Sequence, residues 1–100
     1  MVKKANPESV PPVRYDYKLF SVELGKRIKR LRKESGLTLR ALIVEHGFHL
    51  TQIQRLEKGA GISVPMLLRI AQTFRVSLED LVAGLGKVPE GVESHSETSK

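Results

Sequence analysis

Apolar residues recur every three or four positions through the middle of the chain, in short runs separated by glycine or by small polar residues. This spacing collects apolar side chains on one face of an α-helix, whereas a half-buried strand would alternate polar and apolar residues. The first run predicts a helix over residues 22–35, with Ser21 as its N-cap and Gly36 just past its end. A second, shorter helix is predicted after Thr38, and Gly47 ends it in a left-handed turn.

A third amphipathic run follows directly. It predicts a helix over residues 50–57, between a cap near His49 and a stop at Gly59. Ile53 and Leu56 form the buried seam of this helix, so the polar side chains between them are expected to face outward.

The last two helices open at clear capping residues. Ser63 can cap the fourth helix, whose first turn tolerates Pro65. Ser77 and Asp80 form an S-x-x-D box that opens a short fifth helix over "LEDLVAG". The sequence predicts no internal repeat and no pair of strands.

Five short helices joined by short loops predict an all-α fold, a compact five-helix domain over residues 21–85. Residues 1–20 are expected to form a basic, proline-containing, flexible arm because they show no helical period. Residues 86–100 contain almost nothing to bury and are expected to form a disordered tail. A chain of 100 residues holds one such core, which is small enough to gain from oligomerisation.

Positive charge is concentrated in the first third of the chain. The net charge is +6, and residues 21–36 carry six Lys or Arg residues against two Glu residues. This asymmetry favours a polyanion such as nucleic acid or an anionic membrane surface as partner, although a solvated helix face would show the same pattern. The chain has no Cys, no run long enough to span a membrane and no signal peptide, so a cytoplasmic location without membrane contact is expected.

Candidate catalytic and metal-binding residues are sparse. His46 and His49 form an H-x-x-H pair, but a zinc site needs three or four ligands, so the two histidines are expected to be partly buried or to cap a helix. The carboxylates are scattered, and no Ser/His/Asp set or Gly-rich phosphate loop is present. The sequence therefore predicts no cofactor, no metal and no enzymatic activity.

The two helices joined at "HGFH" have the spacing of a helix-turn-helix. The run from Leu24 to Leu81 resembles the helix-turn-helix domain of the phage Cro and lambda-repressor superfamily, also called the xenobiotic-response-element type. The resemblance is carried, in unbroken spacing, by "LGKRIKRLRKESGLT", Leu42, Gly47, "I-x-R-L-E-K-G" from Ile53, and "LLRIAQTFRVSLEDL". It implies a lambda-repressor-like fold that binds double-stranded DNA.

The resemblance also implies that residues 50–57 form the recognition helix, which lies in a major groove. The base-reading candidates are Leu50, Thr51 and Arg55, with Gln54 and Gln52 at the edge of that set. An Arg side chain can hold guanine bidentately, but Arg55 could equally contact phosphate or pair with Glu57 or a carboxylate of the first helix.

Phosphate contacts are expected from residues near the ends of the helix pair, and Arg32 matches a phosphate-binding position of the family. The candidates are Arg32, Arg40, Gln52 and Lys58. The other cations are expected to contribute less to DNA binding. Lys26, Lys29 and Lys33 are expected to raise only the long-range field. Lys3 and Lys4 could reach a minor groove, although a solvated terminus is the simpler expectation. Glu57 is expected to support the fold, because phosphate repels a carboxylate.

Four positions depart from the family pattern. Leu39 stands where a phosphate-binding Gln is common, and Ile43 stands where the two helices usually meet through a small residue. His46 replaces a small apolar residue, and Leu50 replaces a polar reader. The expected DNA face is therefore unusually apolar.

The last helix carries more apolar residues than its core contacts require: Leu78, Leu81, Val82 and Leu85. These residues either pair two subunits or close the core, and a homodimer interface is the favoured interpretation. The predicted function is a sequence-specific transcription regulator, a repressor that binds a palindromic operator as a dimer. The alternative is a protein-interaction module, such as the antitoxin of a toxin–antitoxin pair or a phage-type adaptor.

Overall fold

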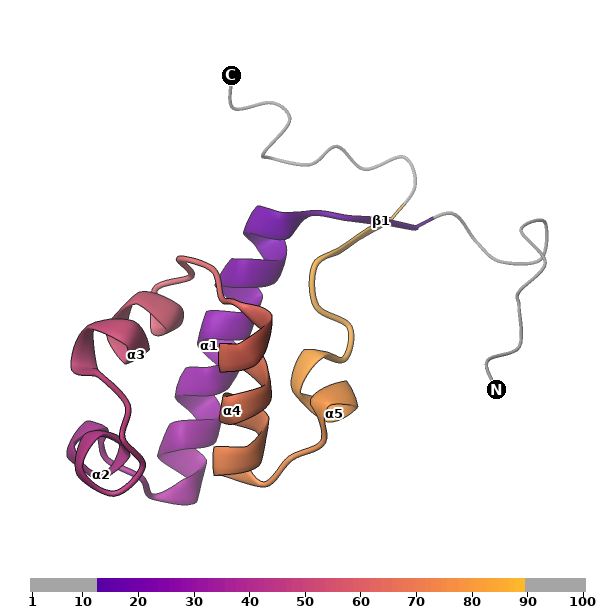
Figure 1. The fold of residues 1–100 in the computed structure, drawn as a ribbon. Helices are drawn as coiled ribbons and strands as arrows, with labels where there is room; N and C mark the ends of the chain where they lie inside the picture. Colours follow the sequence, from indigo (N-terminus) through magenta and orange to yellow (C-terminus); the bar gives the residue numbers. More distant parts are fainter. Residues whose placement is uncertain (1–12, 90–100) are drawn as a thin grey trace.

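The computed structural model describes residues 13–89 of the chain. The elements are, in order, β1 (Val13–Tyr15), α1 (Tyr17–Ser35), α2 (Leu39–Val44), α3 (Leu50–Glu57), α4 (Val64–Phe74), α5 (Leu78–Val82) and β2 (Lys87–Pro89). Helix α1 runs through the domain behind α4, with α2 and α3 on one side and α5 on the other (Figure 1). The predicted five-helix, all-α core is confirmed, and a small strand pair is added to it.

The predicted caps of the middle helices form as expected. Thr38 Oγ1 accepts a hydrogen bond from the Ala41 amide at 3.0 Å, and Ser77 Oγ accepts one from the Asp80 amide at 2.9 Å. At the end of α1, Gly36 adopts the left-handed conformation with φ of 78°. These local signals set the helix boundaries from residue 35 onward, because each satisfies backbone groups that a helix end leaves unpaired.

Helix α1 begins five residues earlier than the sequence pattern predicts. Its N-cap is Asp16, whose Oδ2 accepts a hydrogen bond from the Leu19 amide at 2.8 Å. Ser21 is buried inside the helix instead of capping it, and Phe20 packs against the core one turn before Leu24. The prolines that suggested an arm to residue 20 all lie before residue 13, outside the described residues.

The expectation of no strand pair is also wrong. Strands β1 and β2 are antiparallel, with Arg14 opposite Val88. The Asp16 amide donates to the Gly86 carbonyl at 2.9 Å, and the Gly86 amide donates to a carboxylate oxygen of Glu23 at 2.8 Å. The start of the predicted tail is thus joined to the start of α1, and Val88 is buried. The rest of the predicted arm and tail, residues 1–12 and 90–100, lies outside the described residues.

The core is mainly aliphatic and draws on every helix. Its buried members are Leu24, Ile28, Leu42, Phe48, Ile53, Leu56, Ile70, Ala71, Leu81 and Leu85. Helix α1 contacts α3, α4 and α5, so it is the element on which the others are assembled. The packing of α3 against α1 therefore decides how the third helix is presented to a partner.

Candidate nucleic-acid interface

Three features fix the conformation of the turn between α2 and α3. Gly47 has φ of 75°, a left-handed conformation that glycine adopts without strain. Phe48 is buried, and its amide donates to the Leu42 carbonyl at 3.0 Å. From α4, Arg69 donates from Nη2 to the His46 carbonyl at 2.8 Å, and its guanidinium lies 4.0 Å from the centre of the Phe48 ring. The turn is therefore locked to the fourth helix.

Sequence patterning missed the role of Arg69, because an Arg on an amphipathic helix ordinarily reads as a solvated residue. Its position relative to Phe48, 21 residues earlier, is a tertiary fact. The stacked guanidinium contributes cation–π and hydrogen-bonding stabilisation at the same site.

Helix α3 divides into a buried and an exposed face, as predicted. Ile53 and Leu56 are buried against the domain. The four base-reading candidates share the opposite side and are all exposed: Leu50, Thr51, Gln54 and Arg55. At about 100° per residue, these four positions fall within one half of the helix circumference. The fold thus presents one continuous surface of mixed polar and apolar side chains.

Gln52 helps to cap the start of α3. Its Oε1 accepts a hydrogen bond from the His49 amide at 3.2 Å, which is half of a capping box. The side-chain NH₂ group points away from this bond and is chemically suited to a phosphate oxygen. Of the other phosphate candidates, Arg40 lies exposed in the first turn of α2 and Lys58 lies exposed just after α3.

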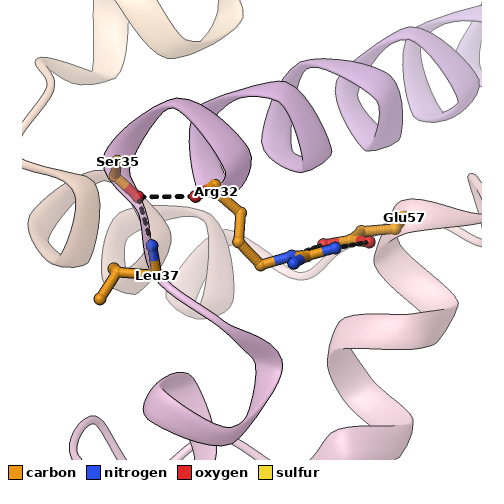
Figure 2. A network of polar contacts seen from close by, with 4 residues as sticks. All are labelled: Arg32, Ser35, Leu37 and Glu57. Carbon is orange, nitrogen blue, oxygen red and sulfur yellow. Dashed lines mark hydrogen bonds and ion pairs between the residues drawn. The ribbon is translucent and has the colours of Figure 1, made fainter.

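Arg32, the remaining phosphate candidate, forms an ion pair within the protein. Its Nε lies 2.7 Å from Glu57 Oε2 and its Nη2 lies 3.1 Å from Glu57 Oε1, which makes a bidentate ion pair (Figure 2). The two side chains retain only 13% and 11% of their exposure. The hydrogen bonds that Arg32 donates to the Glu57 carboxylate raise the pKa of Arg32 above its ordinary value. Glu57 thus takes the Nε–H and one Nη2–H of Arg32, and the phosphate contact predicted for Arg32 stays a prediction that would use its remaining N–H groups.

The same ion pair resolves two other sequence expectations. Glu57 supports the fold, as expected, because its carboxylate joins the end of α3 to α1. Arg55 does not share that carboxylate and remains exposed on α3. Figure 2 also shows Ser35 Oγ donating to the Arg32 carbonyl at 2.9 Å and accepting from the Leu37 amide at 3.4 Å, which ties the end of α1 to the loop before α2.

The departures from the family pattern have structural consequences. Leu39, which stands where a phosphate-binding Gln is common, is partly buried against the core. Ile43 is also partly buried, whereas Leu50 is 43% exposed; Val44, which is not one of the departures, is 68% exposed beside them. The apolar substitutions are therefore shared between the interior and the outer surface of the helix pair.

Both histidines are exposed, so of the two alternatives expected, burial is wrong, and capping applies to His49. His49 occupies the N-cap position of α3, and the carbonyl of His46 accepts the bond from Arg69. Within residues 13–89, no three His, Cys, Asp or Glu side chains are grouped closely enough to hold a metal ion. In the same part of the chain, no helix has the length and apolar character needed to cross a membrane.

The predicted dimer surface is only partly exposed. Leu81 and Leu85 are buried in the core of the chain itself, at 1% and 6% exposure, so they close the core and cannot meet a partner. Leu78 is exposed and Val82 is partly exposed. The sequence could not separate these pairs, because all four fit the periodicity of one short helix.

Comparisons with known proteins agree with this architecture. The model of a family described as "Helix-turn-helix domain" matches residues 23–85. A search of curated protein sequences finds none that matches this chain.

Solved structures share the fold. The DNA-binding domain of BldD from S. venezulae is 20% identical, with a TM-score of 0.59 over 63% of this chain and 96% of that one. The restriction-modification controller protein C.AhdI from Aeromonas hydrophila is 24% identical, with a TM-score of 0.55 over 60% and 92%. The clp gene regulator ClgR from C. glutamicum is 25% identical, with a TM-score of 0.56 over 63% and 83%.

The braced turn, the outward face of the third helix and the family match over more than half of the chain lead to one conclusion. This protein belongs to the helix-turn-helix domain family and is of the Cro and xenobiotic-response-element type that its sequence resembles.

Proposed function

We propose that this protein is a sequence-specific transcription regulator that inserts α3 into the major groove of a palindromic operator. The observation that carries the proposal is the exposed face of α3, held at a fixed angle by the Arg32–Glu57 ion pair and by Arg69. A rigid helix with exposed hydrogen-bonding side chains can contact base edges without losing further backbone conformational entropy on binding. The solved structures with the same fold are described as a DNA-binding domain, a controller protein and a gene regulator.

In this proposal, Arg55 holds O6 and N7 of a guanine, while Thr51 and Gln54 make adjacent polar contacts and Leu50 packs on a thymine methyl. Arg40 and Lys58 contact phosphates on either side of the helix pair, and the free amide of Gln52 contacts another. Binding places the protein across promoter DNA, which represses transcription by occupancy.

The test is binding-site selection from randomised duplexes with the wild type, Arg55→Ala and Lys58→Ala. Loss of the guanine contact should remove preference at one base pair and lower affinity for the selected site by about 5- to 150-fold. Lys58→Ala is the matched control, because loss of a phosphate contact should weaken all sequences alike and reduce the salt slope by about 1. Failure of the wild type to enrich any motif at moderate salt would rule out specific DNA reading.

We also propose that the active form is a homodimer that pairs through α5. Leu78 and Val82 remain accessible on this helix, and Leu68 on the neighbouring α4 keeps 44% of its exposure. A two-fold dimer would place two α3 helices on half-sites about 34 Å apart, which requires a palindrome. Leu78→Lys should give a monomer by light scattering and lose the second half-site in footprinting. A wild-type chain that is monomeric both free and on DNA would refute this assembly.

A second candidate function is capture of another protein, such as a toxin, by the helix pair. It is favoured by the exposure of Val44 and Leu50, two aliphatic side chains on the presumed DNA side. Leu50→Gln separates the two functions. If Leu50 reads DNA, the variant should exchange a selected thymine for another base. If Leu50 binds a protein, the variant should select an unchanged motif and lose affinity for the captured protein.

A further inference from the structure

A row of cations lies on the outer side of α1, away from the buried Leu24 and Ile28. All its members are exposed, at helical spacing, and we call them the outer basic face: Lys26, Lys29, Arg30 and Lys33. Together with Glu34 they line a shallow hollow of about 400 Å³. None of these four side chains belongs to the hydrophobic core, so core packing does not explain the row.

Three other charged residues of the same helix make contacts inside the protein, whereas Lys18 is exposed near the start of the helix. Arg27 donates from Nη1 to the carbonyl of Ala83 at 2.8 Å, and Arg32 is held by Glu57. The carboxylate of Glu23 accepts the Gly86 amide. Glu34 is thus the acidic side chain left beside the outer basic face, which keeps a local excess of three positive charges.

The outer basic face points in a different direction from the exposed face of α3, which carries the base-reading candidates. Helix α1 meets α3 through Gly25 and Arg32, the first packed against the Leu56 carbonyl and the second bonded to Glu57. Lys26 and Lys33 each follow one of these residues by one position, which turns them by about 100° around the helix axis. A duplex seated on α3 therefore leaves the centre of the outer basic face open to solvent.

We propose that the outer basic face binds the phosphate backbone of a second DNA duplex, so that one protein molecule holds two duplexes together. From Lys26 to Lys33 the helix rises roughly 10 Å. A duplex presents about six phosphate charges over that length, enough to engage every cation of the row. Lysine side chains act as point charges without a fixed hydrogen-bonding geometry, so this second contact is independent of sequence. The proposal rests on the proposed function for the first duplex.

The test measures capture of a second duplex. A duplex carrying the selected site is immobilised and loaded with protein, and a labelled random-sequence duplex of the same length is then added. The wild type should capture the labelled duplex, and raising the salt from 50 to 200 mM should weaken capture by about 40-fold if three phosphate contacts are made. The triple variant Lys26→Gln, Lys29→Gln and Lys33→Gln should still bind the immobilised duplex but should not capture the second one.

A charge-matched control removes two exposed cations outside α1, Arg75→Asn and Lys87→Gln, and is compared with the double variant Lys29→Gln and Lys33→Gln. This control should capture like the wild type, and equal loss in both double variants would mean that net charge alone is responsible, which overturns the proposal. Capture retained by the outer-face variant would overturn it too, because two α3 helices of a dimer would then bridge the duplexes.

A second measurement separates this proposal from the proposed function. A variant with Arg40, Thr51, Gln54, Arg55 and Lys58 all changed to Ala should still bind a random duplex by anisotropy, and adding the three Lys→Gln changes should abolish that binding. If binding does not depend on those lysines, the outer basic face is not a DNA site, whatever motif α3 selects. If no motif is selected while this binding persists, only the proposed function of α3 fails.

Discussion

At Gly25, α1 packs closely against the backbone at the end of α3, and Gly25→Ala tests whether that contact positions the exposed face of α3. A Cβ atom at this position would lie within 3.0 Å of the Leu56 carbonyl oxygen, and 3.1 Å from both the Glu57 carbonyl oxygen and the Gly59 amide nitrogen. All three atoms belong to the backbone, so no rotamer change relieves the clash. The two helices must move apart for the methyl group to fit.

Two effects of opposite sign compete in this substitution. Alanine in place of glycine inside a helix stabilises that helix by about 1 kcal/mol. Forcing a methyl group into a packed contact costs about 1–3 kcal/mol, and the upper end applies because the contact is with backbone. The net loss should be about 2 kcal/mol, which lowers the melting temperature by roughly 8–16 °C for a domain of this size. The clash therefore outweighs the gain in helix propensity.

The free energy of unfolding is measured by urea titration with circular dichroism at 222 nm, and affinity for the selected duplex by anisotropy. The matched control is Lys26→Ala, an exposed residue on the same helix, which should change stability by less than about 0.5 kcal/mol. Gly25→Ala should also weaken DNA binding under conditions where it is fully folded, because α3 is displaced. A variant as stable as the wild type would refute the reasoning, because the steric clash would then cost no more than the gain in helix propensity.

Three further perturbations test the supports of the domain. A double-mutant cycle of Arg32→Met and Glu57→Leu, measured by urea unfolding, should give a coupling energy of about 1.5–3 kcal/mol. A coupling energy below about 0.5 kcal/mol would mean that the ion pair behaves as a solvated surface pair. Arg27→Gln should cost about 1 kcal/mol and speed amide exchange in α5, whose last carbonyls it caps; unchanged exchange would contradict that role. Arg75→Gly should stabilise by about 0.5 kcal/mol, seen as a higher melting temperature, because Arg75 has φ of 57°.

Helix boundaries could be predicted wherever they depend on neighbouring residues. Thr38, Ser63 and Ser77 cap their helices in the structure, and the seam of Ile53 and Leu56 is buried, as the local pattern indicates. The start of α1 was missed although a signal was present, since Phe20 continues the apolar spacing one turn upstream. The strand pair joins residues about 70 positions apart, and no local pattern encodes such a pairing.

For the candidate site, the sequence by itself determined which helix faces outward and which side chains it carries, because amphipathic spacing is a property of one helix. Only the tertiary structure decided which charges are free. It assigned Arg32 to Glu57, Arg69 to the turn and Leu81 to the core, and it left the lysines of α1 exposed. The physical reason is that ion pairing and burial depend on residues brought together by packing, and many sequences of equal periodicity would distribute them differently.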